Sequence, residues 1–265
     1  MTAVPNFTEP PVVEMALGAQ FRPLFTLRGI TLGPLRERWR DAYPHVEEQP
    51  PLPPAIEGGL VPGIGLQVGF GPMPNMRHWF LNEAGTELVQ LQHDRLIVNW
   101  RQADTSSAYP RYDRMRTIFE QRLADLAGFV EQQGLGSIEI VQAEANYINA
   151  VGVQPEGRGH LGGVLRGWVG TPDHHLGEPE EARVALAFAV PDLGRPPVRM
   201  YVNVDPAQRG DGSPVLFMTL TVRGAPAGAG IADTLEFVDG AHEHLVQSFM
   251  ELTAEPMHSA WGLRE

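Results

Sequence analysis

Residues 87–126 read ELVQLQHDRLIVNWRQADTSSAYPRYDRMRTIFEQRLADL, and this stretch decides the fold class. Apolar and polar residues alternate with a period of two at 87–92 and again at 95–101. Such alternation is typical of half-buried β-strands. Because only His93 and Asp94 separate the two runs, we predict a β-hairpin with one apolar and one polar face.

The second part of the same stretch has the spacing of a helix. Apolar residues recur every three or four positions between Tyr112 and Val130, which is typical of an amphipathic helix. Pro110 fits the first turn, because proline lacks the amide hydrogen that would stay unpaired there. Gly134 follows as a stop signal. We therefore predict that this helix covers the apolar face of the hairpin.

The front of the chain adds a strand and a short helix to this unit. Residues 12–21 alternate as a strand, and Gly33-Pro34 opens a helix that Pro44 ends. The proline-rich residues 49–54 suit an extended connector. A further strand is predicted at 66–70, and residues 1–11 are expected to be a flexible lead-in.

The back half repeats the same order of elements. We predict strands at 138–151, 183–190, 198–205 and 215–223, a short helix at 159–169 and a closing helix at 232–253. The pairs Trp39/Trp168 and Phe119/Phe249 are separated by nearly equal lengths of chain. These observations indicate an internal duplication, with chance agreement as the alternative.

The predicted fold class is α+β, with two β-α-β(n)-α repeats that share a curved antiparallel sheet. The repeats span residues 12–135 and 136–265 and pack as one globular unit, with the long helices on one face. This element order resembles the duplicated helix-grip or TATA-box-binding-protein-like topology. Such a resemblance implies the fold and carries no function with it.

Four short motifs also resemble a sporadically distributed bacterial family of similar length. They are Pro10-Pro11-Val12-Val13-Glu14, Arg77-His78-Trp79-Phe80, Asn99-Trp100-Arg101 and Tyr109-Pro110-Arg111-Tyr112. The resemblance implies a single stand-alone unit and assigns no catalytic residue.

Composition excludes several classes of site. The 265 residues are 43% hydrophobic and 20% charged, as in ordinary globular proteins, and contain no cysteine. Disulfides, thiolate zinc sites and cysteine nucleophiles are therefore ruled out. Because no long apolar run or signal-like N-terminus is present, we expect a cytoplasmic protein without a membrane partner. The net charge of −12 disfavours nucleic acid as a partner.

The polar face of the predicted sheet is the main candidate site. Amide and guanidinium groups on a rigid sheet can hold a partner at little cost in conformational entropy, although a solvated outer face is an equally simple interpretation. The candidate residues are Gln90, Gln92, Asn99 and Arg101 in the front half, with Asn146, Tyr201 and Asn203 behind. Tyr109 and Arg111 form a second candidate, an anion site near a helix N-terminus. Pairing of these arginines with carboxylates is the alternative.

Other motifs are weak. His242 and His244 point to different sides of a helix, and His174-His175 lies in a charged loop, so no metal site is expected. The glycine-rich residues 224–230 lack the ending of a phosphate-binding loop. No catalytic motif is recognised, no cofactor is expected, and whether the protein is an enzyme stays open.

Three function classes follow. The first is a non-catalytic module that binds a macromolecular partner, with protein favoured, through the polar sheet face or the groove between the repeats. The second is a small-molecule binding protein or enzyme with a pocket between sheet and helices, where Arg101 or Tyr109 would orient a polar ligand. The third, less favoured, is a nucleic-acid-binding accessory protein. Exposed strand edges would also allow a homodimer.

Overall fold

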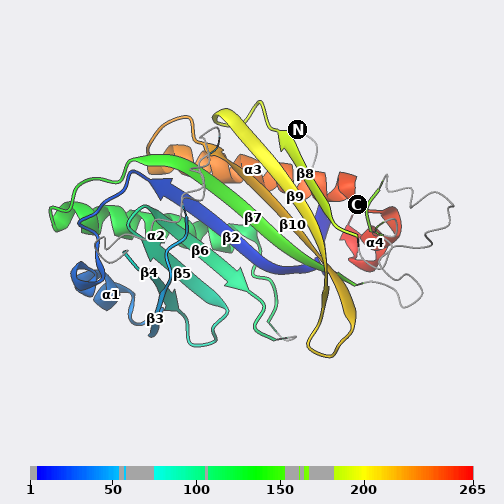
Figure 1. The fold of residues 1–265 in the computed structure, drawn as a ribbon, viewed down its shortest axis with the longest axis horizontal. Coiled ribbons are helices and arrows are strands. Elements are labelled where there is room, and N and C mark those ends of the chain that lie inside the picture. Colours follow the sequence, from blue (N-terminus) through cyan, green and yellow to red (C-terminus); the bar gives the residue numbers. More distant parts are fainter. Residues whose placement is uncertain are drawn as a thin grey trace, which may run out of the picture.

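A computed structural model describes residues 5–53, 57, 75–104, 107–152, 161, 164–166 and 182–264. Its main strands are β2 (Val12–Phe21), β3 (His45–Gln49), β4 (Arg77–Leu81), β5 (Glu87–Gln92), β6 (Arg95–Arg101), β7 (Ile140–Gly152), β8 (Val184–Ala189), β9 (Arg195–Gln208) and β10 (Pro214–Ala225). They form one antiparallel sheet in the order β3-β4-β5-β6-β2-β7-β10-β9-β8. The helices α2 (Tyr112–Gln132) and α3 (Ile231–Leu252) lie on the same face of it (Figure 1). The predicted α+β class is confirmed.

The two halves of the chain meet at the centre of the sheet. β2 and β7, the first long strand of each half, pair antiparallel with Met15 opposite Tyr147. The last hairpin strand of each half comes next, β6 beside β2 and β10 beside β7. Gly18 makes room in β2, because a Cβ there would approach Cγ of Glu144 to 3.0 Å. The order is what two similar halves would give, and their common origin stays a hypothesis.

The core lies between the sheet and the helices. Side chains that face the helices are buried along both central strands, for example Leu17 in β2 and Ala145 in β7. Met115, Phe119 and Leu123 from α2 are fully buried against them. Each large apolar side chain removed from water contributes about 1.5–3 kcal/mol, so this layer fixes the sheet as a rigid support.

Two elements differ from the sequence-based expectation. The long helix begins at Tyr112, and Pro110 lies before it rather than in its first turn. Arg111 adopts φ 74°, and its side chain reaches back to the N-terminal segment. The strand β3 was not predicted, because its residues carry no apolar alternation; it pairs with β4 at the edge of the sheet.

The expectation that residues 1–11 form a flexible lead-in is wrong for the second part of this segment. Asn6–Phe7 forms β1, which pairs with β11 (Leu263–Arg264). The ring of Phe7 is 5% exposed and packs edge-on against Phe249 of α3. Two-residue strands have no period in a sequence, so only the tertiary contacts of Phe7 reveal this one. The strand expected at 66–70 and most of the helix expected at 159–169 lie outside the described residues.

The remaining helices are short. α1 (Gly33–Trp39) opens with Gly33-Pro34 as predicted and buries Leu35 and Trp39, and α4 (Glu255–Ala260) follows α3. None of the described helices combines the length and apolar character needed to cross a membrane. The homodimer expected from exposed strand edges stays a prediction.

Candidate functional site

A cavity of about 500 Å³ lies between the sheet and α3. Leu220 of β10 and Leu245, Val246 and Phe249 of α3 give it apolar walls. The N-terminal segment around Phe7 closes one side. Its volume lies within the range of about 300–1,000 Å³ that is usual for small-molecule sites.

A chain of hydrogen bonds converges on this cavity from three separate elements. The hydroxyl of Tyr147, on β7, lies 2.9 Å from Nδ1 of His242 on α3. It also lies 3.2 Å from the hydroxyl of Tyr109, in the segment before α2. The ring of Tyr112 stacks on the His242 imidazole with a centroid distance of 3.9 Å. All four side chains line the cavity, so it offers polar groups at one end of an apolar space.

These polar groups are uncharged near neutral pH. Burial lowers the pKa of His242 to about 4, which keeps the imidazole neutral. Burial also raises the pKa of Tyr109 to about 12 and raises the pKa of Tyr147 well above its usual value. These phenol and imidazole groups therefore offer neutral hydrogen bonds to the interior of the cavity.

Charged side chains line the cavity at the start of α2. The Arg111 guanidinium donates to the backbone carbonyl oxygens of Phe7, at 2.9 Å, and Thr8, at 3.1 Å. Asp113 lies in the first turn of α2 and also lines the cavity. The predicted anion site thus coincides with the cavity, although Arg111 directs these two hydrogen bonds to main-chain carbonyls.

In the front half, the side chains of the polar sheet face form hydrogen bonds with other groups of the protein. Gln90 and Asn99 are buried, and Nε2 of Gln90 donates to Oδ1 of Asn99 at 2.7 Å. Asn99 in turn donates to Glu14 at 2.8 Å. The Arg101 side chain donates to the carbonyl oxygen of Gly85. The structure brings these predicted residues onto one face, where they bond to one another, to neighbouring side chains and to the main chain.

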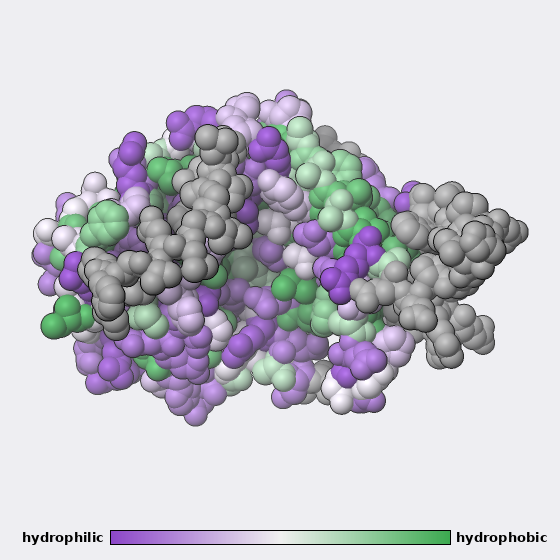
Figure 2. Space-filling model, viewed as in Figure 1, coloured by the Kyte–Doolittle hydropathy of each residue, from purple (hydrophilic) through white to green (hydrophobic). Residues whose placement is uncertain are grey.

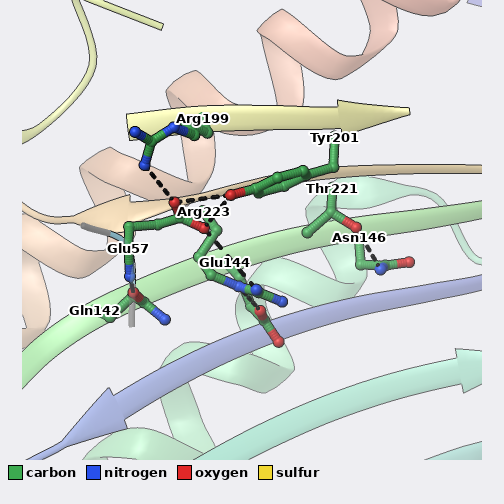
Figure 3. A network of polar contacts seen from close by, with 8 residues as sticks. All are labelled: Glu57, Gln142, Glu144, Asn146, Arg199, Tyr201, Thr221 and Arg223. Atoms are coloured by element: carbon green, nitrogen blue, oxygen red, sulfur yellow. Dashed lines mark hydrogen bonds and ion pairs between the residues drawn. The ribbon is translucent and has the colours of Figure 1, made fainter. Parts of the chain in front are cut away.

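The back half of the same face carries a charged network around Glu57 (Figure 3). Arg199 donates to its carboxylate at 2.9 Å, and the Tyr201 hydroxyl lies 2.8 Å from both carboxylate oxygens. Arg223 pairs with Glu144 at 2.7 Å. Figure 2 shows this face as largely hydrophilic, with a hydrophobic area on the side of β8 and β9.

The other two predicted residues of the back half lie on the same face. Asn146 donates to the Thr221 hydroxyl at 2.8 Å, and Asn203 lies opposite Thr219 in the β9–β10 pair. Gln92, from the front half, is buried and bonds to Asp94 and to the main chain at Leu52.

Sequence reasoning missed Tyr147, His242 and Glu57. The alternation of β7 does place Tyr147 on the helix side, and His242 follows Ala241 in the apolar stripe of α3, so a buried polar pair could have been suspected. Glu57 lies in a proline-rich stretch without periodicity, and nothing in the sequence connects it to β9.

The described residues contain no group of three metal-ligating side chains, and His174-His175 lies outside them. No protein-family model matches the chain, and no curated protein is significantly similar to it.

Proposed function

We propose that the protein binds a small, mainly apolar organic molecule in the cavity between the sheet and α3. The observation that carries this proposal is the hydrogen-bonded chain of Tyr109, Tyr147 and His242, which ends at a cavity of about 500 Å³. Apolar pockets with a few convergent polar groups are the usual form of small-molecule sites. The apolar walls would supply affinity, and the phenol and imidazole groups would orient the ligand.

The part of the lining formed by Tyr109, Tyr147 and His242 favours an uncharged group of the ligand. A carboxylate or ammonium group would lose its hydration beside neutral phenols, and no opposite charge would compensate within the chain of Tyr109, Tyr147 and His242. A hydroxyl or carbonyl group fits, because phenols both donate and accept hydrogen bonds. We therefore infer an aromatic or aliphatic molecule with such a group at one end.

Binding without chemical conversion is the favoured form of this function. Proton transfer at neutral pH needs groups whose pKa lies near 7. The His242 pKa of about 4 and the Tyr109 pKa of about 12 lie far from that value. These groups suit a fixed hydrogen-bonding role.

A fluorescent probe tests the proposal. N-phenyl-1-naphthylamine is uncharged, apolar and fluoresces strongly only out of water, and we expect it to bind the wild-type protein with one site per chain. Val246→Trp places an indole in the cavity and should abolish binding, whereas the matched control Val246→Ala should retain it. Equal binding by folded Val246→Trp protein would contradict the proposal.

Recognition of a macromolecular partner by the polar sheet face is the other class expected from the sequence. Nucleic acid has little support there, because the arginines of this face already pair with protein acceptors. These pairs are Arg77 with Gln90, Arg95 with Asp94, Arg199 with Glu57 and Arg223 with Glu144. A peptide partner has a specific observation in its favour, which concerns Glu57.

A further inference from the structure

Part of the chain that follows β3 lies on the polar face of the sheet. The amide group of Gln92, on β5, binds the main chain of Leu52 twice. Its Oε1 accepts from the Leu52 N–H at 2.8 Å, and its Nε2 donates to the Leu52 carbonyl at 3.2 Å. Arg95 of β6 donates to the carbonyl of Pro53 at 3.0 Å. The front half of the sheet therefore holds this piece through its backbone.

Glu57 lies on the other half of the same face. Its backbone N–H donates to Oε1 of Gln142 on β7 at 2.8 Å. Its carboxylate bonds to Arg199 and Tyr201 of β9, and Nη1 of Arg223 lies 4.0 Å away. The Glu57 side chain is only 7% exposed. We call the group Gln142, Arg199, Tyr201 and Arg223 the glutamate socket (Figure 3).

These contacts combine the two elements of peptide recognition. A side-chain amide can bond to both the N–H and the carbonyl of one residue. It then recognises an extended backbone independently of the peptide's sequence. Arginine and tyrosine side chains around a carboxylate select for an acidic residue, because charge-assisted hydrogen bonds to a carboxylate are strong and directional.

A partly open cavity lies beside the covering piece. A second cavity of about 220 Å³ lies between Leu52-Pro53 and the strands, and Arg95, Gln142 and Glu144 line it. Leu52, Pro53 and Glu57 are held on this face by hydrogen bonds and an ion pair, which another segment of the same chemistry can also form.

We propose that the polar sheet face binds an extended, proline-rich peptide with a glutamate, and that Leu52, Pro53 and Glu57 occupy this site in the free protein. The site is independent of the proposed ligand cavity. Tyr147 and Leu220 of the cavity face the helices, whereas the glutamate socket lies on the opposite face of the sheet. The partner is a protein segment with the chemistry of residues 49–59, QPPLPPAIEGG.

A free peptide has to compete with Leu52, Pro53 and Glu57, which occupy the site and belong to the same chain. A tethered ligand acts at an effective concentration on the order of millimolar, so a free peptide binds wild-type protein only weakly. Removing the Glu57 carboxylate empties the glutamate socket without removing any strand. Peptide affinity should then rise by roughly tenfold or more, since the charge-assisted contacts become free.

Fluorescence anisotropy with a labelled QPPLPPAIEGG peptide measures this directly. Glu57→Ala protein should bind the peptide at least about tenfold more tightly than wild-type protein does. Glu47→Ala, which removes an exposed glutamate of β3, is the matched control and should bind like wild type. A peptide with glutamine in place of its glutamate should lose the gain.

A second variant tests the glutamate socket itself. Arg199 is 41% exposed, so Arg199→Ala in the Glu57→Ala background should fold, as circular dichroism and the melting temperature verify, and should lose peptide binding. If Glu57→Ala protein is folded and binds no better than wild type, the proposal is overturned. Equal binding of the glutamate and glutamine peptides, or unchanged binding after Arg199→Ala, overturns it as well.

Discussion

The two faces of the sheet use adjacent residues of one strand in opposite ways. Tyr147 of β7 points to the helices and joins the buried chain with Tyr109 and His242. Its neighbour Asn146 points to the other face and bonds to Thr221 beside the glutamate socket. The helix-facing cavity combines this neutral chain with apolar walls and with the charged side chains at the start of α2, and the open face offers paired charges.

The difference follows from access to water. Burying an unpaired charge costs far more than burying a neutral hydroxyl that keeps its hydrogen bonds. The open face carries charged groups such as Arg199, which remains 41% exposed, whereas Tyr109, Tyr147 and His242 on the helix side stay neutral. Stability should come mainly from the helix side and selectivity from both sides. Four predictions test this division, from the largest expected effect to the smallest.

Truncating an apolar side chain that lines the cavity should cause the largest loss of unfolding free energy among the four predictions. Phe249→Ala deletes a ring that is 7% exposed and packs on Phe7 and Trp261, so the free energy of unfolding should fall by about 3–5 kcal/mol. Urea denaturation measures it. Phe25→Ala, at a side chain that is 67% exposed, is the control and should change stability by no more than about 0.5 kcal/mol. Similar losses in both variants would remove the distinction.

Acid should destabilise the helix side through His242. In the unfolded chain this imidazole takes up a proton below its ordinary pKa of 6.5, whereas in the folded protein it stays neutral until about pH 4. The free energy of unfolding should therefore fall between pH 6.5 and 4, with up to about 3 kcal/mol from this group. Stability above pH 6.5 should not depend on it.

His242→Gln isolates this contribution. Urea denaturation at pH 7 and at pH 4.5 should show a smaller acid loss in the variant than in wild type. His45→Gln, at an exposed histidine of β3, is the matched control and should lose as much as wild type does. An unchanged loss in His242→Gln would show that the imidazole is already charged in the folded state.

Deleting one tyrosine hydroxyl should destabilise the protein more on the helix side of the sheet than on the open face. Tyr147→Phe leaves Nδ1 of His242 and the Tyr109 hydroxyl without their shared partner, and it should cost about 1–2 kcal/mol of unfolding free energy. Tyr201→Phe, on the open face, should cost less, because water can reach the Glu57 site through the partly exposed Arg199. Thermal unfolding of both variants compares them. A larger loss for Tyr201→Phe would reverse the ranking.

Neutralising Glu57 should have the smallest effect on stability. Glu57→Gln keeps the size of the side chain, and its main partner Arg199 remains partly exposed, so the loss should stay within about 1 kcal/mol. Melting at low and high NaCl concentrations should show a weaker salt dependence than in wild type. A loss of several kcal/mol would mean that the glutamate socket is a structural element of the core.

Much of the fold could be predicted from the sequence because it is local. The period of two at 12–21 and 87–101 and the helical spacing at 232–253 reproduce β2, β5, β6 and α3 closely. The strand register places the candidate residues of β5, β6, β7 and β9 on one side of the sheet, and their role in binding stays a prediction. β1 and β3 were missed because they are short and have no apolar pattern of their own.

The sequence by itself determined the α+β class, the absence of thiol chemistry and, in the strands with apolar alternation, the side of the sheet on which each residue lies. Only the tertiary structure decided that Tyr109, Tyr147 and His242 meet at one cavity and that Glu57 sits in a socket built from β7, β9 and β10. The physical reason is that the alternation of apolar and polar residues indicates on which face of the sheet a side chain lies. The partner across that face comes from a distant part of the chain and is set by packing.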